Sequence, residues 1–150
     1  MSPEAINIPD KIRVFQNSRD SESRGTIVPL PIANATGEAF PDLIYDQTRQ
    51  RLYIANPGLN RVEVFDIKTQ KLLAPIKVGQ LPVSMVLTSD GATLYVANSG
   101  GETISVVDPD TLRATGTIVF PPVPFNSNIA VSTPVLISSA ISGVQFLMSN

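Results

Sequence analysis

The residues that could do chemistry in this chain of 150 residues are carboxylates, amides and hydroxyls, because the sequence contains no histidine and no cysteine. Their absence excludes a Ser-His-Asp triad, a histidine general base, a thiolate nucleophile and the usual zinc ligand sets. Asp108 and Asp110 alternate, but no loop with the spacing of a calcium-binding EF-hand follows them. The sequence therefore predicts no catalytic residue, no metal site and no cofactor.

The composition is that of a folded chain with little net charge. Hydrophobic residues make up 43% and charged residues 16%, which is too apolar for a disordered chain. A net charge of −2 gives no electrostatic reason to expect nucleic acid or an anionic membrane as a partner. Residues 114–150 carry no charge, but four prolines interrupt them, so we expect buried strands there and no membrane span.

An internal repeat organises the elements that must position any functional side chain. Residues 52–56 (LYIAN) recur as residues 94–98 (LYVAN), a shift of 42 residues. The register then holds without a gap, so that Asp66 falls on Asp108 and Pro82 on Pro124. Pro41 matches Pro82 at a shift of 41, and we therefore expect one extra residue in the turn at 89–91.

Weaker copies extend the repeat to both ends. Residues 11–15 resemble residues 61–65, and residues 146–150 resemble residues 94–98. In the second complete copy of the repeat we expect strands at about Ser84–Thr88, Thr93–Asn98, Thr103–Asp108 and Arg113–Phe120. Gly and Pro mark the turns between them, and Asn56-Pro57-Gly58 predicts a type II turn in the first unit.

The strand at residues 94–97 is apolar on both of its faces. Leu94 and Val96 point one way and Tyr95 and Ala97 the other, so the strand must be covered on both sides. No helical pattern separates the strands, which excludes a parallel α/β sheet in the central region. Four strands per repeat of about 42 residues are typical of a β-propeller. We predict an all-β propeller fragment with two complete four-stranded antiparallel blades and partial blades at both ends.

The same residues resemble a known repeat. Tyr95-Val96-Ala97-Asn98, the preceding turn at 89–91 and the following residues 104–108 resemble the YVTN-type β-propeller repeat, and residues 53–56 match it more loosely. The resemblance covers about residues 40–124. It implies a surface-layer, periplasmic or secreted propeller. Most members resemble binding modules, and lactonase-like and amine dehydrogenase-like relatives share the blade design.

The length implies an incomplete ring, because 150 residues hold about 3.6 repeats and closed propellers have about four to eight blades. We expect a partial blade at about 1–36, blades at about 37–79 and 80–123, and the start of another at about 124–150. The remaining blades of the same protein would then be partners. Several copies that complete one ring are the alternative.

Connectivity predicts where a ligand would bind. The loop between the second and third strands of a blade lies at the same end as the crossover to the next blade, and loops on a rigid scaffold concentrate binding residues. The polar candidates at this end are Asn56, Asn60, Arg61, Gln80, Asn98, Glu102, Asn126 and Asn128.

Structural roles compete with these assignments. Asn56 and Asn98 precede a turn, where an asparagine side chain bonds to its own backbone. Asp66 and Asp108 each open the turn between the third and fourth strands, and Tyr53 and Tyr95 have the spacing of core residues.

The leading hypothesis is a non-enzymatic propeller module of an extracytoplasmic protein that binds a protein or polysaccharide through its loops. The alternative is a lactonase-like or dehydrogenase-like propeller enzyme whose active residues lie outside this chain. A structural array on the cell surface is a third reading.

Overall fold

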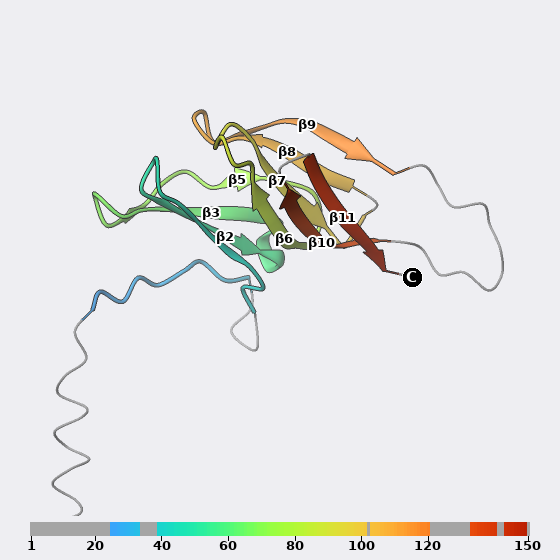
Figure 1. The fold of residues 1–150 in the computed structure, drawn as a ribbon. Coiled ribbons are helices and arrows are strands. Elements are labelled where there is room, and N and C mark those ends of the chain that lie inside the picture. The colour runs from blue at the N-terminus through green and yellow to red at the C-terminus, as the bar shows by residue number, and fades with distance from the viewer. Residues whose placement is uncertain (1–24, 34–38, 102, 121–132, 141–142, 150) are drawn as a thin grey trace, which may run out of the picture. The chain divides into compact units, whose positions relative to one another are not determined.

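The computed structural model describes residues 25–33, 39–101, 103–120, 133–140 and 143–149. Of the N-terminal unit, residues 1–30, it describes residues 25–30, which form neither helix nor strand. The second unit, residues 31–150, is built from antiparallel sheets (Figure 1). Most of the partial blade expected at 1–36 lies outside the described residues, as do the expected boundaries at 36–37 and 123–124. The boundaries of the expected blades therefore stay predictions.

The first sheet contains β1 (Leu43–Asp46), β2 (Arg51–Asn56) and β3 (Arg61–Asp66) in sequence order. Its fourth position is divided between β4 (Lys71–Leu72) and β5 (Ile76–Lys77), both of which pair with β3. Pro75 lies between these two short strands and has no amide hydrogen to give to the ladder. A 3-10 helix, η2 (Pro57–Leu59), joins β2 to β3.

The second sheet has the order β6 (Pro82–Leu87), β7 (Leu94–Asn98), β8 (Thr103–Asp108) and β9 (Arg113–Val119). These strands lie within two residues of the predicted ones, and the two antiparallel sheets confirm the all-β fold. A hairpin of β10 (Thr133–Ala140) and β11 (Gly143–Ser149) follows, and β10 lies against β6 and β7.

The two sheets are structural copies of each other. Tyr53 of β2 stands between Ile44 and Val64, and Tyr95 of β7 stands between Val86 and Val106, its counterparts 42 residues later. Residues 52–55 and 94–97 thus occupy the second strand of adjacent sheets, as the repeat predicts.

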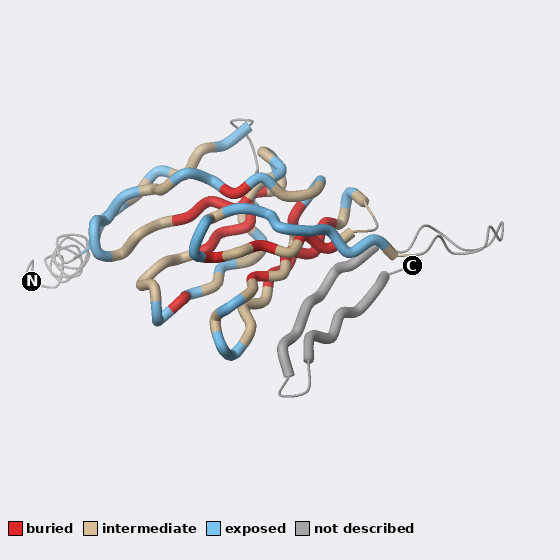
Figure 2. The backbone as a smooth tube through the Cα atoms, turned by 90° about the horizontal axis from the view of Figure 1, so that it is seen from above, coloured by how far each residue is buried: buried red, intermediate tan, exposed pale blue. Residues whose placement is uncertain are grey.

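One apolar core joins the sheets. It contains Tyr53, Ala55, Val62, Val64 and Ile76 from the first sheet and Met85, Leu94, Val96 and Val107 from the second. Each of these side chains is at least 96% buried. In Figure 2 the buried residues run along the middle of the inner strands, whereas most turns and the whole of β9 are exposed. Removing such side chains from water contributes about 1.5–3 kcal/mol each, so face-to-face packing dominates the stability of the pair.

Two local predictions are wrong. Leu43 lies opposite Ile54 and Met85 opposite Val96, so the shift is already 42 at the first strand. The extra residue is Val83, in a bulge between Pro82 and Ser84, and not in the turn at 89–91. The predicted type II turn at Asn56 is instead the helix η2, because Asn56 accepts a hydrogen bond from the Leu59 amide and caps it.

Candidate functional site

The loops predicted to share one end of the sheets lie together. We use the term loop face for residues 56–60, 78–81 and 98–101. Asn60 Oδ1 accepts a hydrogen bond from the Leu81 amide at 2.9 Å, and the Leu81 carbonyl accepts one from the Ser99 amide at 2.9 Å. The Gly100 amide donates to the Gln80 carbonyl at 3.0 Å. These bonds join the β2–β3 loop, the crossover between sheets and the β7–β8 loop into one surface.

Asn56 is 1% exposed and lies inside this surface. Its Nδ2 donates to Glu63 Oε1 at 2.8 Å and to the Pro31 carbonyl at 2.9 Å, while Oδ1 accepts from the Leu59 amide at 3.2 Å. The amide is therefore saturated by the chain itself. This geometry favours the turn-forming role over ligand contact.

Asn98 is fully buried at the equivalent place. Its Nδ2 donates to Ser105 Oγ at 3.0 Å and to Thr103 Oγ1 at 3.2 Å, whereas Oδ1 has no hydrogen-bond partner among the described residues. A Cβ added to Gly79 would lie 2.6 Å from Asn98 Cγ, so only glycine allows the crossover to pass this close. The Asn98 side chain thus packs against the crossover between the two sheets at Gly79.

Asn60, Arg61 and Gln80 are the sequence-predicted candidates that reach solvent. Asn60 and Gln80 are exposed, and the side chain of Arg61 is 26% exposed. Arg61 Nε donates to Glu63 Oε1 at 2.6 Å, and this contact anchors the guanidinium. Asn60 sits in the left-handed region at φ 51°, which asparagine tolerates better than most residues. The surface can therefore donate hydrogen bonds to an acceptor-rich ligand such as a carboxylate. Glu102, Asn126 and Asn128 lie outside the described residues.

Sequence reasoning did not single out Glu63, which is 2% exposed and holds both Arg61 and Asn56. The sequence signal that could have pointed to Glu63 is a charged residue inside the apolar strand β3. The second sheet has Ser105 at the equivalent position.

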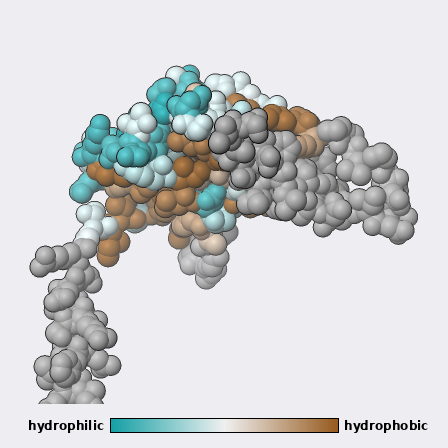
Figure 3. All heavy atoms as spheres, viewed as in Figure 1, coloured by the Kyte–Doolittle hydropathy of each residue, from teal (hydrophilic) through white to brown (hydrophobic). Residues whose placement is uncertain are grey.

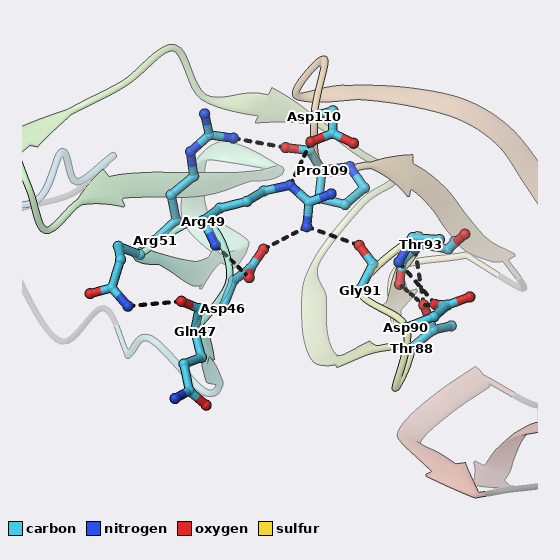
Figure 4. A network of polar contacts seen from close by, with 12 residues as sticks. Asp46, Gln47, Arg49, Arg51, Thr88, Asp90, Gly91, Thr93, Pro109 and Asp110 are labelled. Atoms are coloured by element: carbon cyan, nitrogen blue, oxygen red, sulfur yellow. Dashed lines mark hydrogen bonds and ion pairs between the residues drawn. The ribbon is translucent and has the colours of Figure 1, made fainter.

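A second polar cluster lies at the opposite end of the sheets (Figure 4). Arg49 donates to buried Asp46 at 2.9 Å, to the Gly91 carbonyl at 2.9 Å and to Asp110 at 2.6 Å. The hydrogen bond with Arg49 lowers the pKa of the Asp110 carboxyl. Arg51 donates to the Pro109 carbonyl at 2.8 Å. The cluster connects turns of both sheets.

An open groove of about 540 Å³ lies apart from the loop face, between the outer strands of the two sheets. It is lined by Ala74, Pro75, Lys77, Thr111, Leu112, Arg113 and Ala114. Within the described ranges, no three acidic side chains gather as metal ligands would.

Comparisons with known proteins agree on the fold. No protein-family model matches the chain. Protein NirF of Stutzerimonas stutzeri is 36% identical over 59 residues, which cover 39% of this chain and 15% of NirF. Kuenenia stuttgartiensis hydrazine synthase matches 79% of this chain and 31% of its own, with a TM-score of 0.58 and 24% identity.

Dihydro-heme d1 dehydrogenase NirN in complex with DHE matches 71% of this chain and 22% of its own, with a TM-score of 0.58 and 16% identity. The chain thus spans less than a third of each of these proteins. Its two sheets are adjacent blades of a β-propeller.

Proposed function

We propose that this chain supplies adjacent blades to a β-propeller enzyme related to protein NirF, whose catalytic groups lie in other parts of the protein. The supporting observation is the 36% identity to NirF in a chain that has the propeller fold of NirN. We place an enzyme before the non-enzymatic module because hydrazine synthase and dihydro-heme d1 dehydrogenase, whose structures share this fold, are named as enzymes.

The proposed substrate class is a tetrapyrrole, following the dihydro-heme d1 in the name of NirN. The chain has no histidine or cysteine, so the usual side-chain ligands of a haem iron would come from elsewhere. The described residues fit a different role. Gln80, Asn60 and Arg61 could donate hydrogen bonds to the carboxylate side chains of such a substrate at the loop face.

Absorbance titration of the complete protein with haemin and with dihydro-haem d1 tests this proposal. We expect a Soret shift that saturates, and a Kd raised about 2- to 10-fold by Gln80→Ala, the loss of one hydrogen bond. Gln80 suits this test because its side chain makes no described hydrogen bond within the chain. Arg113→Ala, on the exposed strand β9, is the control and should leave Kd unchanged. A flat titration with both pigments would refute the proposal.

A binding module for a protein or polysaccharide remains the second proposal. It is supported by the hydrogen bonds that hold the loop face rigid while Asn60 and Gln80 stay exposed. Binding of soluble polysaccharides that Gln80→Ala weakens, without any pigment binding, would favour it.

We also propose a periplasmic, secreted or cell-surface location, which the YVTN-type resemblance supports. None of the helical residues described could form a span across a bilayer. An alkaline phosphatase fusion to the complete gene product would be active under this proposal and inactive if the protein stays in the cytoplasm.

A further inference from the structure

An open groove lies between the outer strands of the two sheets, away from the loop face. We use the term outer groove for this opening of about 540 Å³, lined by residues 74, 75 and 77 of the first sheet and 111–114 of the second. Strands β5 and β9 contact each other. The volume lies within the range of ligand sites, about 300–1,000 Å³. Neither the pigment proposal nor the loop face involves this groove.

Pro75 explains why the first sheet leaves this side open. Proline has no amide hydrogen, and Ala74 and Pro75 leave the ladder between β4 and β5 and are exposed. The equivalent of Pro75, 42 residues later, is Thr117, which pairs with Ser105 within the continuous strand β9. The first sheet therefore contributes an irregular segment to the groove, and the second sheet contributes the start of a regular strand.

Two cationic side chains, one from each sheet, line the groove. Lys77 and Arg113 are exposed, and neither side chain forms an ion pair or a hydrogen bond among the described residues. Arg113 stands opposite Asp108 in the strand register. Its own turn occupies the Asp108 carboxylate, which accepts from the Asp110 amide at 2.8 Å and from Thr111 Oγ1 at 2.9 Å. Both cations can therefore bind a carboxylate from outside the chain.

Strand β9 adds a second kind of binding group, because it forms the outer edge of its sheet (Figure 1). All seven of its residues are exposed, and no described strand pairs with its outer side. Figure 3 shows hydrophilic residues over the turn that leads into β9 and hydrophobic residues toward the end of that strand.

Proteins commonly protect such an edge with lysine, proline or a bulge. Between Arg113 and Val119 the strand has no lysine and no proline, and only the bulge at Thr115 interrupts its pairing with β8. The outward amides and carbonyls of β9 can therefore pair with an added strand.

We propose that the outer groove binds an extended acidic segment of a partner protein, which adds a strand to β9 and places carboxylates on Lys77 and Arg113. A peptide matches both features of the site. Its backbone supplies donors and acceptors to the strand edge, and carboxylates two residues apart stand on one face of an extended chain. A carboxylated polysaccharide would meet the two cations but has no backbone ladder for the edge.

Fluorescence anisotropy of the complete protein with a dye-labelled peptide of four Glu-Val repeats tests the proposal. We expect saturable binding that weakens as salt is added, because salt screens exposed charges. Lys77→Ala and Arg113→Ala should each raise Kd about 2- to 5-fold, the loss of one exposed ion pair. Lys71→Ala is the matched control and should leave Kd unchanged, since this exposed lysine is the counterpart of Arg113 but does not line the groove.

A methylated peptide separates strand pairing from charge. The same peptide with every amide N-methylated keeps its carboxylates but cannot donate hydrogen bonds to β9. We expect it to bind at least about 10-fold more weakly, because several hydrogen bonds are lost. Amides of β9 should also exchange hydrogen more slowly when the unmethylated peptide is bound.

An absence of binding would overturn the proposal, and so would equal affinity for the methylated and unmethylated peptides or an equal effect of Lys71→Ala. Saturable binding of polygalacturonate without peptide binding would identify an acidic polysaccharide as the occupant and would also overturn it. The inference does not rest on the pigment proposal. Arg113→Ala should weaken binding of the peptide and leave pigment binding unchanged, and Gln80→Ala should do the reverse, so the two proposals fail separately.

Discussion

The Nε atom of Arg49 lies 2.6 Å from Oδ1 of Asp110, although 61 residues separate the two in sequence. Arg49 belongs to the turn between β1 and β2, and Asp110 to the turn between β8 and β9. The contact therefore joins the two blades at the end opposite the loop face. Arg49 also binds Asp46, whose side chain is 2% exposed, so one guanidinium serves both a buried and an exposed carboxylate.

Arg49→Ala should destabilise the chain by about 1–3 kcal/mol, because it leaves the buried carboxylate of Asp46 without its charged partner. Asp110→Asn should have a much smaller effect, since Asp110 is 73% exposed and solvent screens its charge. Urea unfolding followed by circular dichroism measures both variants. Equal losses of unfolding free energy in the two variants would contradict the expected difference between Arg49 and Asp110.

The Arg49–Asp110 contact should also make stability depend on pH. The folded pKa of Asp110 lies below its ordinary value of 3.8. The contribution of the pair is therefore complete above pH 3.8 and is lost as the pH falls through the lower, folded value. Comparing acid unfolding of the parent chain with that of Asp110→Asn should show a shallower acid limb in the variant. An identical acid limb would show that the pair is not formed.

Gly79→Ala should destabilise the crossover by about 1–3 kcal/mol, because the added methyl overlaps the Asn98 side chain. Gly101→Ala is the matched control, since the nearest side-chain atom to its added Cβ lies at 3.9 Å. The double variant Gly79→Ala/Asn98→Ala should recover part of the loss, which a double-mutant cycle would detect. Strict additivity would refute the contact.

Asn56→Asp should cost far more than Asn98→Asp. At position 56 the new carboxylate would face Glu63 Oε1, which now accepts a hydrogen bond at 2.8 Å, and an uncompensated buried charge costs about 3–5 kcal/mol. At position 98 the neighbours are the hydroxyls of Thr103 and Ser105, which can donate to a carboxylate. Lowering the pH should relieve the first variant selectively. Thermal unfolding of both variants at two pH values is the measurement.

The 42-residue repeat predicted the second sheet closely because a strand covered on both sides, such as β7, must be apolar on both faces, and β8 begins and ends at the predicted residues. The repeat placed the extra residue in the turn at 89–91 and not at Val83. An extra residue in a bulge and one in a longer turn change the spacing between the two copies by the same amount, so the sequence does not distinguish them. The turn after Asn56 was misjudged because Asn56 Oδ1 reaches the Leu59 amide, a contact that the Pro-Gly pair does not reveal.

The loop face was predicted from connectivity alone, but the roles within it were not. The sequence places both Asn56 and Asn60 at the loop face and does not distinguish their roles. Burial does, because Asn56 lies in the interior and Asn60 at the surface. The Arg49 cluster escaped prediction because Arg49 and Asp110 become neighbours only when the two blades pack together.

Methyl NMR offers the most direct test that the central repeats are adjacent blades packed face to face. The chain has three methionines, so the labelled methyl of Met85 can be assigned by a Met85→Leu variant. Our account predicts nuclear Overhauser contacts from this methyl to side chains of β2, which belong to the same core. Contacts confined to β7 and its own sheet, with none to β2, would contradict it.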